Sequence, residues 1–502
     1  MSELPLTLSQ HYHERTKYDP ATLAQRGRTL NFAEQPSPYK NYPVGSHYDL
    51  KPYLKADVEP QSPLARLSRL LYFSYGITAA IPTPNETFYL RAAPSAGGLY
   101  PAEIYVIARE DAILPPGLYN YQVLTHTLCH FWSDQVWPAF ESACLWHPAL
   151  RATPLALVVT SVFQRSAWRY EDRAYRRIFL DSGHLLGNLE LAATLNHYRV
   201  HLLGGFIDAD LNQLLYLDDR EEGAIAALAL ADLLEINQNL PHYPPALPSP
   251  TQTNFPDIPD GDLLLQCYQS SQIEDPTLVY RQHQDLLPKT DAYNFAFCEK
   301  IPTQVEPIGW QDPSLEETIH RRRSTRRYTG EAIDLDALLK LLDFAYHPEQ
   351  SMEQGFDGSP DFFDLSLIET FIAVSAVNGL EAGCYYYAVQ AQELRQIRFK
   401  QFRAELYRLC LHQELGRDAA AVIFHTANLQ AATERYGDRT YRYLHLDAGH
   451  LGQRLNLAAI QMGLGVSGIA GFFDDQVNEV LGIPEAEAVL YLTTIGQPPR
   501  QP

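Results

Sequence analysis

The sequence is short of paired cysteines and of positive charge. Its six cysteines include no Cys-x-x-Cys pair and no histidine cluster has zinc-binding spacing, so we expect scattered thiols in a reducing compartment and no metal site. Only 39 basic residues stand against 60 acidic ones. The resulting formal net charge of −21 argues against nucleic acid and anionic membrane surfaces as partners, because both would be repelled.

Long apolar segments are also missing. The longest, residues 223–234, is interrupted by Asp232 and is too short to span a bilayer. The first ten residues are polar and mixed, unlike a signal peptide. We therefore expect a soluble, cytoplasmic protein. With 502 residues and 46% hydrophobic content, the chain should fold into two or three domains.

One segment of the chain occurs twice. Residues 169–188 read RYEDRAYRRIFLDSGHLLGN and residues 435–454 read RYGDRTYRYLHLDAGHLGQR, so eleven of twenty positions are identical at a shift of 266 residues. Chance would give about one identity. The same shift relates other pairs, among them Gly117 with Gly383, Pro94 with Pro360, and Gly205 with Gly471. A constant shift over more than a hundred residues indicates duplication of a whole domain rather than a short solenoid repeat.

The repeat divides the chain into four parts. Residues 1–60 have no partner at this shift and are interpreted as an irregular N-terminal arm. Residues 61–238 and 311–502 are the two repeated domains. Residues 239–310 begin with a proline-rich stretch, which favours extended backbone, and we expect a linker that passes over the surface.

Each repeated domain alternates helical and strand patterns. Residues 67–75 and 335–346 have helical apolar spacing, and residues 104–108 and 370–374 are short β-branched runs typical of buried strands. Residues 184–195 and 450–462 predict long, largely buried helices. The fold class is therefore α+β, with two fused domains, each a mixed sheet covered by helices. The two equivalent long helices should pack as they would in a homodimer, giving an intramolecular pseudo-dimer.

The most concentrated charge in the chain is the stretch HRRRSTRRYTG, residues 320–330. It contains five arginines within seven residues, with a serine and a threonine between them. Guanidinium groups bind phosphate through paired hydrogen bonds, so a phosphate site is one interpretation. A solvated basic turn at the end of a helix is the alternative.

The residues that follow favour the phosphate site. The stretch RRRSTRRYTGEAIDLDALLKLLDFA resembles the opening of the nitroreductase family, where an Arg-x-Ser-x-Arg pattern holds the phosphate of FMN. The resemblance implies that Arg322, Arg323, Ser324 and Arg326 bind this phosphate. The segment GLGVSGIAGFFDDQ is similar to the family's main chain near flavin N5, which implies contacts from Ala470 and Gly471. Arg500 resembles a basic residue that closes over the phosphate, although Gln497 stands at its usual position.

The first domain carries a different part of the pattern. Its RAAPSAGGLYPAEIYVI, residues 91–107, resembles a motif of the SagB-type dehydrogenase branch, which includes azoline oxidases of peptide natural products. This resemblance implies that Pro94, Ser95, Ala96 and Gly97 contact the flavin ring, with glycine allowing close approach of the backbone. A glycine-rich turn before a strand is the structural alternative. The resemblance covers about residues 65–238 and 311–500.

The two domains have lost complementary parts of this site. At the shift of 266, residues 95–98 (Ser-Ala-Gly-Gly) become residues 361–364 (Asp-Phe-Phe-Asp), whose phenylalanines would fill the space for a ring. The first domain has no arginine cluster; its nearest substitute is Arg15-Thr16-Lys17. In the family, each flavin lies between two subunits. One seam should therefore keep a complete site, and we expect one FMN per chain.

These patterns predict an FMN-dependent oxidoreductase. It would transfer a hydride or electrons to or from a small organic molecule or a peptide heterocycle, with NADPH or NADH as candidate reductants. The alternatives are a non-enzymatic flavin-binding scaffold derived from a degenerate tandem, and a peptide-processing component that acts only in a complex. No side chain stands out as a general acid or base. Tyr100 beside the glycine loop is one candidate, although a packing role fits it better. For Asp181 with His184, a structural role is favoured over a metal-binding one.

Overall fold

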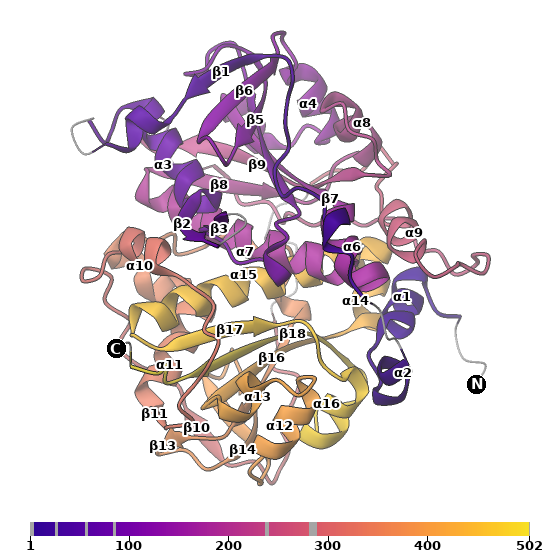
Figure 1. Ribbon diagram of the computed structural model, residues 1–502, viewed down its shortest axis with the longest axis vertical. Helices are drawn as coiled ribbons and strands as arrows, with labels where there is room; N and C mark the ends of the chain where they lie inside the picture. The colour runs from indigo at the N-terminus through magenta and orange to yellow at the C-terminus, as the bar shows by residue number, and fades with distance from the viewer. Residues whose placement is uncertain are drawn as a thin grey trace.

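The computed structural model describes residues 5–25, 29–55, 59–83, 87–235, 240–280 and 289–500. Figure 1 shows two bodies, each a sheet with helices packed on it. The first half of the chain forms the upper body and the second half the lower one. Helices α7 (Ala174–Leu195) and α15 (Thr440–Gln461) lie between them.

The sheet of the first half has the strand order β1-β6-β5-β4-β7-β9-β8. Its strands are β1 (Ser46–Asp49), β4 (Ala102–Ala108), β5 (Gly117–Gln122), β6 (Thr127–Trp132), β7 (Leu155–Val162), β8 (Tyr198–Leu203) and β9 (Glu222–Asp232). A separate hairpin joins β2 (Ile77–Pro82) to β3 (Thr87–Arg91). Besides α7, the helices of this half are α3 (Pro63–Tyr75), α4 (Trp137–Ala143), α5 (Pro148–Ala152), α6 (Phe163–Tyr170) and α8 (Asp208–Leu214).

The sheet of the second half repeats this arrangement in the order β10-β15-β14-β12-β16-β18-β17. Its strands are β10 (Lys300–Pro302), β12 (Glu369–Val374), β14 (Gly383–Ala388), β15 (Glu393–Arg398), β16 (Ala421–Asn428), β17 (Gly465–Ile469) and β18 (Glu487–Gly496). A two-residue parallel pair joins β11 (Ile333–Asp334) to β13 (Val377–Asn378). The helices are α10 (Leu315–Arg321), α11 (Leu335–Tyr346), α12 (Arg403–Leu409), α13 (Glu414–Asp418), α14 (Leu429–Tyr436), α15 and α16 (Asp474–Leu481). Elements β14, β16, α14 and α15 each begin 266 residues after β5, β7, α6 and α7, so the duplication is confirmed in the fold.

The α+β class is confirmed, but the expectation of mixed sheets is wrong. Every strand pair within the two large sheets of the described chain is antiparallel. Strands β4 and β9 are buried along their whole length because elements cover both faces of the sheet. A strand buried on both faces reads as a continuous apolar run, a pattern that does not separate parallel from antiparallel pairing.

Helices α7 and α15 form the contact between the halves. Residues 174–193 of α7 and 440–459 of α15 are buried without exception. Where the helices cross, a Cβ atom placed on Gly183 would lie 2.2 Å from the Leu446 carbonyl oxygen, and one on Gly449 would lie 2.3 Å from that of Leu180. The two backbones therefore touch directly at a pair of glycines related by the repeat.

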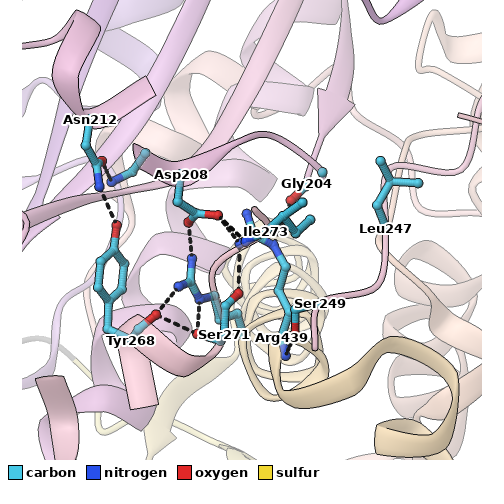
Figure 2. A network of polar contacts seen from close by, with 12 residues as sticks. Gly204, Asp208, Asn212, Leu247, Ser249, Tyr268, Ser271, Ile273 and Arg439 are labelled. Atoms are coloured by element: carbon cyan, nitrogen blue, oxygen red, sulfur yellow. Dashed lines mark hydrogen bonds and ion pairs between the residues drawn. The ribbon is translucent and has the colours of Figure 1, made fainter. Parts of the chain in front are cut away.

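Two buried ion clusters tie each half to the other. In one, Asp208 of the first half accepts hydrogen bonds from Arg439 (2.6 Å) and Arg442 (2.8 Å) of the second half (Figure 2). In its repeat-related counterpart, the second-half carboxylate of Asp474 accepts them from Arg173 (2.9 Å) and Arg176 (2.7 Å) of the first half. These contacts account for the duplicated arginines as structural ion pairs.

The N-terminal arm is less irregular than expected, because its first helix has a counterpart. Helix α1 (Leu8–Thr16) and helix α9 (Leu263–Ser270) begin 255 residues apart and occupy equivalent places. Arg176 donates to the His13 carbonyl oxygen of α1, and Arg442 donates to the Tyr268 carbonyl oxygen of α9. The search at a shift of 266 missed this relation since the connecting segments differ in length. A short helix, α2 (Pro20–Gln25), follows α1.

The linker does not simply pass over the surface. Residues 244–247 are buried, and the Pro245 carbonyl oxygen accepts the backbone N–H groups of Gly204 (2.9 Å) and Gly205 (3.1 Å). Proline favours an extended backbone and leaves its carbonyl free to accept, so a proline-rich segment can fill an interior groove. Linker residues 239 and 281–288, like arm residues 1–4, 26–28 and 56–58, lie outside the described part of the chain.

We predict that Gly449→Ala lowers the apparent free energy of unfolding by about 1–3 kcal/mol, because its methyl group would overlap the Leu180 carbonyl. This loss should appear although alanine favours helices over glycine by about 1 kcal/mol. Gly309→Ala is the control, since no atom lies within 4 Å of its Cβ position. Equal urea midpoints for the two variants would contradict direct contact between the helices.

Candidate functional site

The arginine-rich stretch begins where helix α10 ends. Ser314 and Glu317 form a capping box that fixes the start of α10, and the helix ends at Arg321, so the residues that follow are extended. Thr325 pairs with β17 through its backbone N–H to the Val466 carbonyl (2.8 Å) and through its hydroxyl from the Val466 N–H (2.9 Å). The cluster is therefore held against the sheet of its own half.

Most of the arginines line one hollow of about 740 Å³. Its charged side chains are those of Arg321, Arg323, Arg326, Arg327 and Arg500, with the hydroxyl of Ser324 beside them and no carboxylate in the lining. The guanidinium groups of Arg326 and Arg500 are exposed and form no hydrogen bond or ion pair within the described residues. Five guanidinium groups without a carboxylate form a donor set that fits a phosphate monoester.

Arg322 lies apart from this lining and faces the first half. Its Nε donates to the Ala92 carbonyl oxygen (2.6 Å) and its Nη2 to that of Arg91 (3.0 Å). Burial lowers the pKa of Arg322 to about 10, and no carboxylate within the described residues pairs with it. The second-half cluster thus touches the segment of the first half that leads directly into Pro94.

The glycine loop of the first half is held by a buried carboxyl group. Asp181 of α7 accepts from the hydroxyl of Ser95 (2.6 Å) and from the Ala96 N–H (3.1 Å). Burial raises the pKa of Asp181 to about 7, although both hydrogen bonds favour the ionised form. Gly97 has a φ of +67°, a conformation that glycine adopts without strain. The Ser95 hydroxyl, expected to face a ring, instead fixes the loop.

The segment at Ala470 and Gly471 reaches the same face of α7. The backbone N–H groups of both residues form no hydrogen bond within the described part of the chain. A Cβ atom on Gly471 would lie 3.6 Å from Nη2 of Arg177, one helical turn before Asp181. Through α7, the two segments predicted to contact a ring therefore lie side by side.

Arg177 is a functional candidate that the sequence reasoning missed. It is 5% exposed, its Nη1 is completely buried without a hydrogen-bond partner, and its guanidinium lies 3.8 Å from the centre of the Tyr170 ring. A buried cation without a carboxylate or acceptor is costly unless a ligand supplies one. The available signal was a mismatch inside the duplicated segment, where Tyr443 stands at the position of Arg177.

The equivalent place in the other seam is filled by protein. The Phe363 ring lies 2.3 Å from the Cβ position of Gly204 and stacks on Tyr443 at 4.8 Å. The neighbouring Phe362 stacks on His450 at 4.1 Å. The N–H groups of Gly204 and Gly205, which correspond to those of Ala470 and Gly471, are satisfied by Pro245. The phenylalanines fill space as expected, and the linker completes the filling.

The remaining candidates have structural partners. Arg15 pairs with Asp260, Thr16 accepts from Arg176, and Lys17 pairs with Glu14 and Asp475, so these residues form no clamp. The Tyr100 hydroxyl accepts the Arg91 N–H (3.1 Å), in agreement with a packing role. His184 contacts Gln453 and Tyr491 rather than Asp181. Among the described residues there is no group that could hold a metal ion, and none of their helices is long and apolar enough to cross a membrane.

Comparisons with known proteins agree with this duplicated arrangement. The family model described as "Nitroreductase family" matches residues 59–231 and again residues 319–497. The chain is similar to a putative nitroreductase of Anabaena variabilis ATCC 29413, whose crystal structure has 61% sequence identity and a TM-score of 0.93 and is matched over 98% of this chain and 99% of that one.

Two shorter matches concern parts of the chain. A putative nitroreductase of Methanocaldococcus jannaschii is 31% identical over 180 residues, which are 36% of this chain and 90% of that protein. The trifolitoxin-processing protein TfxB of Rhizobium leguminosarum bv. trifolii is 30% identical over 183 residues, 35% of this chain and 49% of that protein.

We predict that Arg177→Leu leaves the melting temperature of the ligand-free chain unchanged or higher, because it removes an unpartnered buried charge. Arg442→Leu, at an equally buried but fully bonded arginine, should cost about 3–5 kcal/mol of stability. Thermal unfolding of both variants provides the comparison. Similar losses in both would show that Arg177 is a structural residue.

Proposed function

The chain belongs to the nitroreductase family, and from that premise we propose that it is an FMN-dependent oxidoreductase with one flavin between its two halves. The single observation that carries the proposal is the contrast between the seams. One seam has a cationic hollow, free N–H groups and an unpartnered buried guanidinium, whereas the other is filled by aromatic side chains and linker.

The donors available in the first seam fit the parts of FMN. Arg323, Ser324, Arg326 and Arg500 would hold the phosphate, with Arg322 behind them as a buried positive charge. The N–H groups of Ala470 and Gly471 and the backbone of residues 94–97 would line the ring, and Arg177 would face its electron-rich edge. When bound, the flavin supplies the hydride or electron chemistry. Asp181 positions the loop through Ser95 and Ala96.

The two halves would then act as the two subunits of a dimer joined in one chain. The second half supplies the phosphate cluster and the first half supplies the loop, so neither half alone contains a complete site. The contact from Arg322 to the carbonyl groups of Arg91 and Ala92 supports this division. We propose NADPH or NADH as the reductant and a small organic molecule or a peptide heterocycle as the substrate.

A peptide substrate has one specific point in its favour. The relative TfxB is a trifolitoxin-processing protein, although the match covers 49% of that protein. The Pro-Ser-Ala-Gly loop, which resembles the SagB-type branch, is the part of the site held by Asp181. We propose membership of this branch on those two grounds.

The first prediction concerns the number of flavins. Denaturing the purified chain should release one FMN per chain, measured by flavin absorbance against protein concentration. Phe363 and Pro245 occupy the second place, so no second flavin can enter without moving both. Release of two FMN molecules per chain would refute the one-site arrangement.

The second prediction concerns the phosphate hollow. Arg326→Ala should weaken FMN binding by about 1.5–3 kcal/mol, or roughly 10- to 150-fold, because it removes a charged hydrogen bond. Arg220→Ala, an exposed arginine far from the cluster in the sequence, should bind FMN as the unmodified chain does. Fluorescence titration of flavin-free protein measures both affinities. Equal affinities would remove the hollow from the site.

A further inference from the structure

A second hollow, of about 670 Å³, opens beside the proposed ring site. Two of its lining tyrosines reach that site from opposite sides. Tyr18 lies 4.0 Å from the Cβ position of Gly471, and the hydroxyl of Tyr170 lies 2.9 Å from that of Gly97. The rest of the lining comes largely from the N-terminal arm and from residues 260–263, outside both segments matched by the family model. This hollow therefore has the position of a substrate pocket specific to this chain.

The charges of this hollow are paired, with one exception. Arg15 pairs with Asp260, Arg173 pairs with Asp474, and the carboxylate of Asp172 accepts the N–H groups of Gly261 and Leu264. Arg169 is exposed and forms no hydrogen bond or ion pair with the described residues. It is a cation in the lining without a carboxylate in that part of the chain.

The other half of the chain shows which group such an arginine binds. Arg435 and Tyr436, the repeat equivalents of Arg169 and Tyr170, both hold the carboxylate of Asp364. Arg435 Nη1 lies 3.0 Å from Oδ2 of Asp364, and the Tyr436 hydroxyl donates to the same oxygen at 2.9 Å. The second seam thus contains a carboxylate bound by an arginine–tyrosine pair.

The first half keeps the pair and lacks the carboxylate. At the shift of 266 the position of Asp364 is taken by Gly98, and the neighbouring Gly97 directs its Cβ position at Tyr170 and at Cδ of Arg169, 3.4 Å away. The Tyr170 hydroxyl has no hydrogen-bond partner within the described residues. Space and donors that Asp364 occupies in one seam are therefore open in the other.

We infer that Arg169 and the Tyr170 hydroxyl bind a carboxylate of the substrate, so that the enzyme acts on organic acids or on peptides bearing a free carboxylate. This substrate class rests on the proposed function, because the pair lies at the mouth of the proposed flavin site. The arginine supplies the charge and the tyrosine supplies the second hydrogen bond, as Arg435 and Tyr436 do for Asp364.

The test compares an acid with its neutral analogue on the full chain as purified with its flavin. Isothermal calorimetry with 4-nitrobenzoate and 4-nitrobenzamide should show tighter binding of the acid. Arg169→Ala should weaken binding of the acid about tenfold or more and leave the amide unchanged, since one charged hydrogen bond is lost. Tyr170→Phe should weaken the acid several-fold. Arg435→Ala and Tyr436→Phe are the matched controls, which should lower the melting temperature without changing either affinity.

The outcomes separate this inference from the proposed function. Equal affinity for acid and amide, or normal acid binding by Arg169→Ala, overturns the inference while the flavin content supports the function. Acid-selective binding through Arg169 in a chain that retains no FMN overturns the function and supports the carboxylate pair. Loss of flavin in Arg169→Ala assigns this arginine to the cofactor and overturns its role in substrate binding.

Discussion

The direct contact between helices α7 and α15 sets the geometry of everything else. Because Gly183 and Gly449 have no side chains, the two backbones touch, and side chains one or two turns away reach both halves. Asp181 and Arg177 lie on α7 beyond this crossing, and Tyr443 and Asp447 occupy the equivalent places on α15. The crossed ion clusters at Asp208 and Asp474 then fix the halves on either side. Each seam is therefore composite, and neither can open independently of the helix pair.

The same scaffold has produced two different seams through a few substitutions. Asp181 and Asp447 both hold a loop through its backbone N–H groups, so the loops are anchored alike. At the next turn the seams differ, because Arg177 has donors without acceptors whereas the Tyr443 hydroxyl donates to the Gly204 carbonyl. The polar groups of one seam are satisfied by protein, and those of the other are left for a ligand. In this family, duplication followed by loss is a simple route to a single site in one chain.

The sequence predicted the features that depend on repetition and composition. The shift of 266 gave the duplication, the arginine stretch gave the cationic hollow, and the Asp-Phe-Phe-Asp segment gave the filled seam. It did not predict features that depend on three-dimensional packing. A proline-rich segment reads as exposed, yet its carbonyl groups satisfy buried glycine N–H groups. Arg322 and Arg323 read alike, although one bonds across to the first half and the other lines the hollow. The antiparallel pairing and the relation of α1 to α9 were hidden for similar reasons.

The most direct test of the central claim, that one seam binds a flavin and the other is closed by the chain itself, is a crystal structure of the full chain with FMN. We expect density for one flavin, with its phosphate among Arg323, Ser324 and Arg326 and its ring beside Arg177, while Phe363 still packs on Gly204. A flavin lodged between Gly204 and a displaced Phe363, or an arginine hollow without phosphate, would contradict the account.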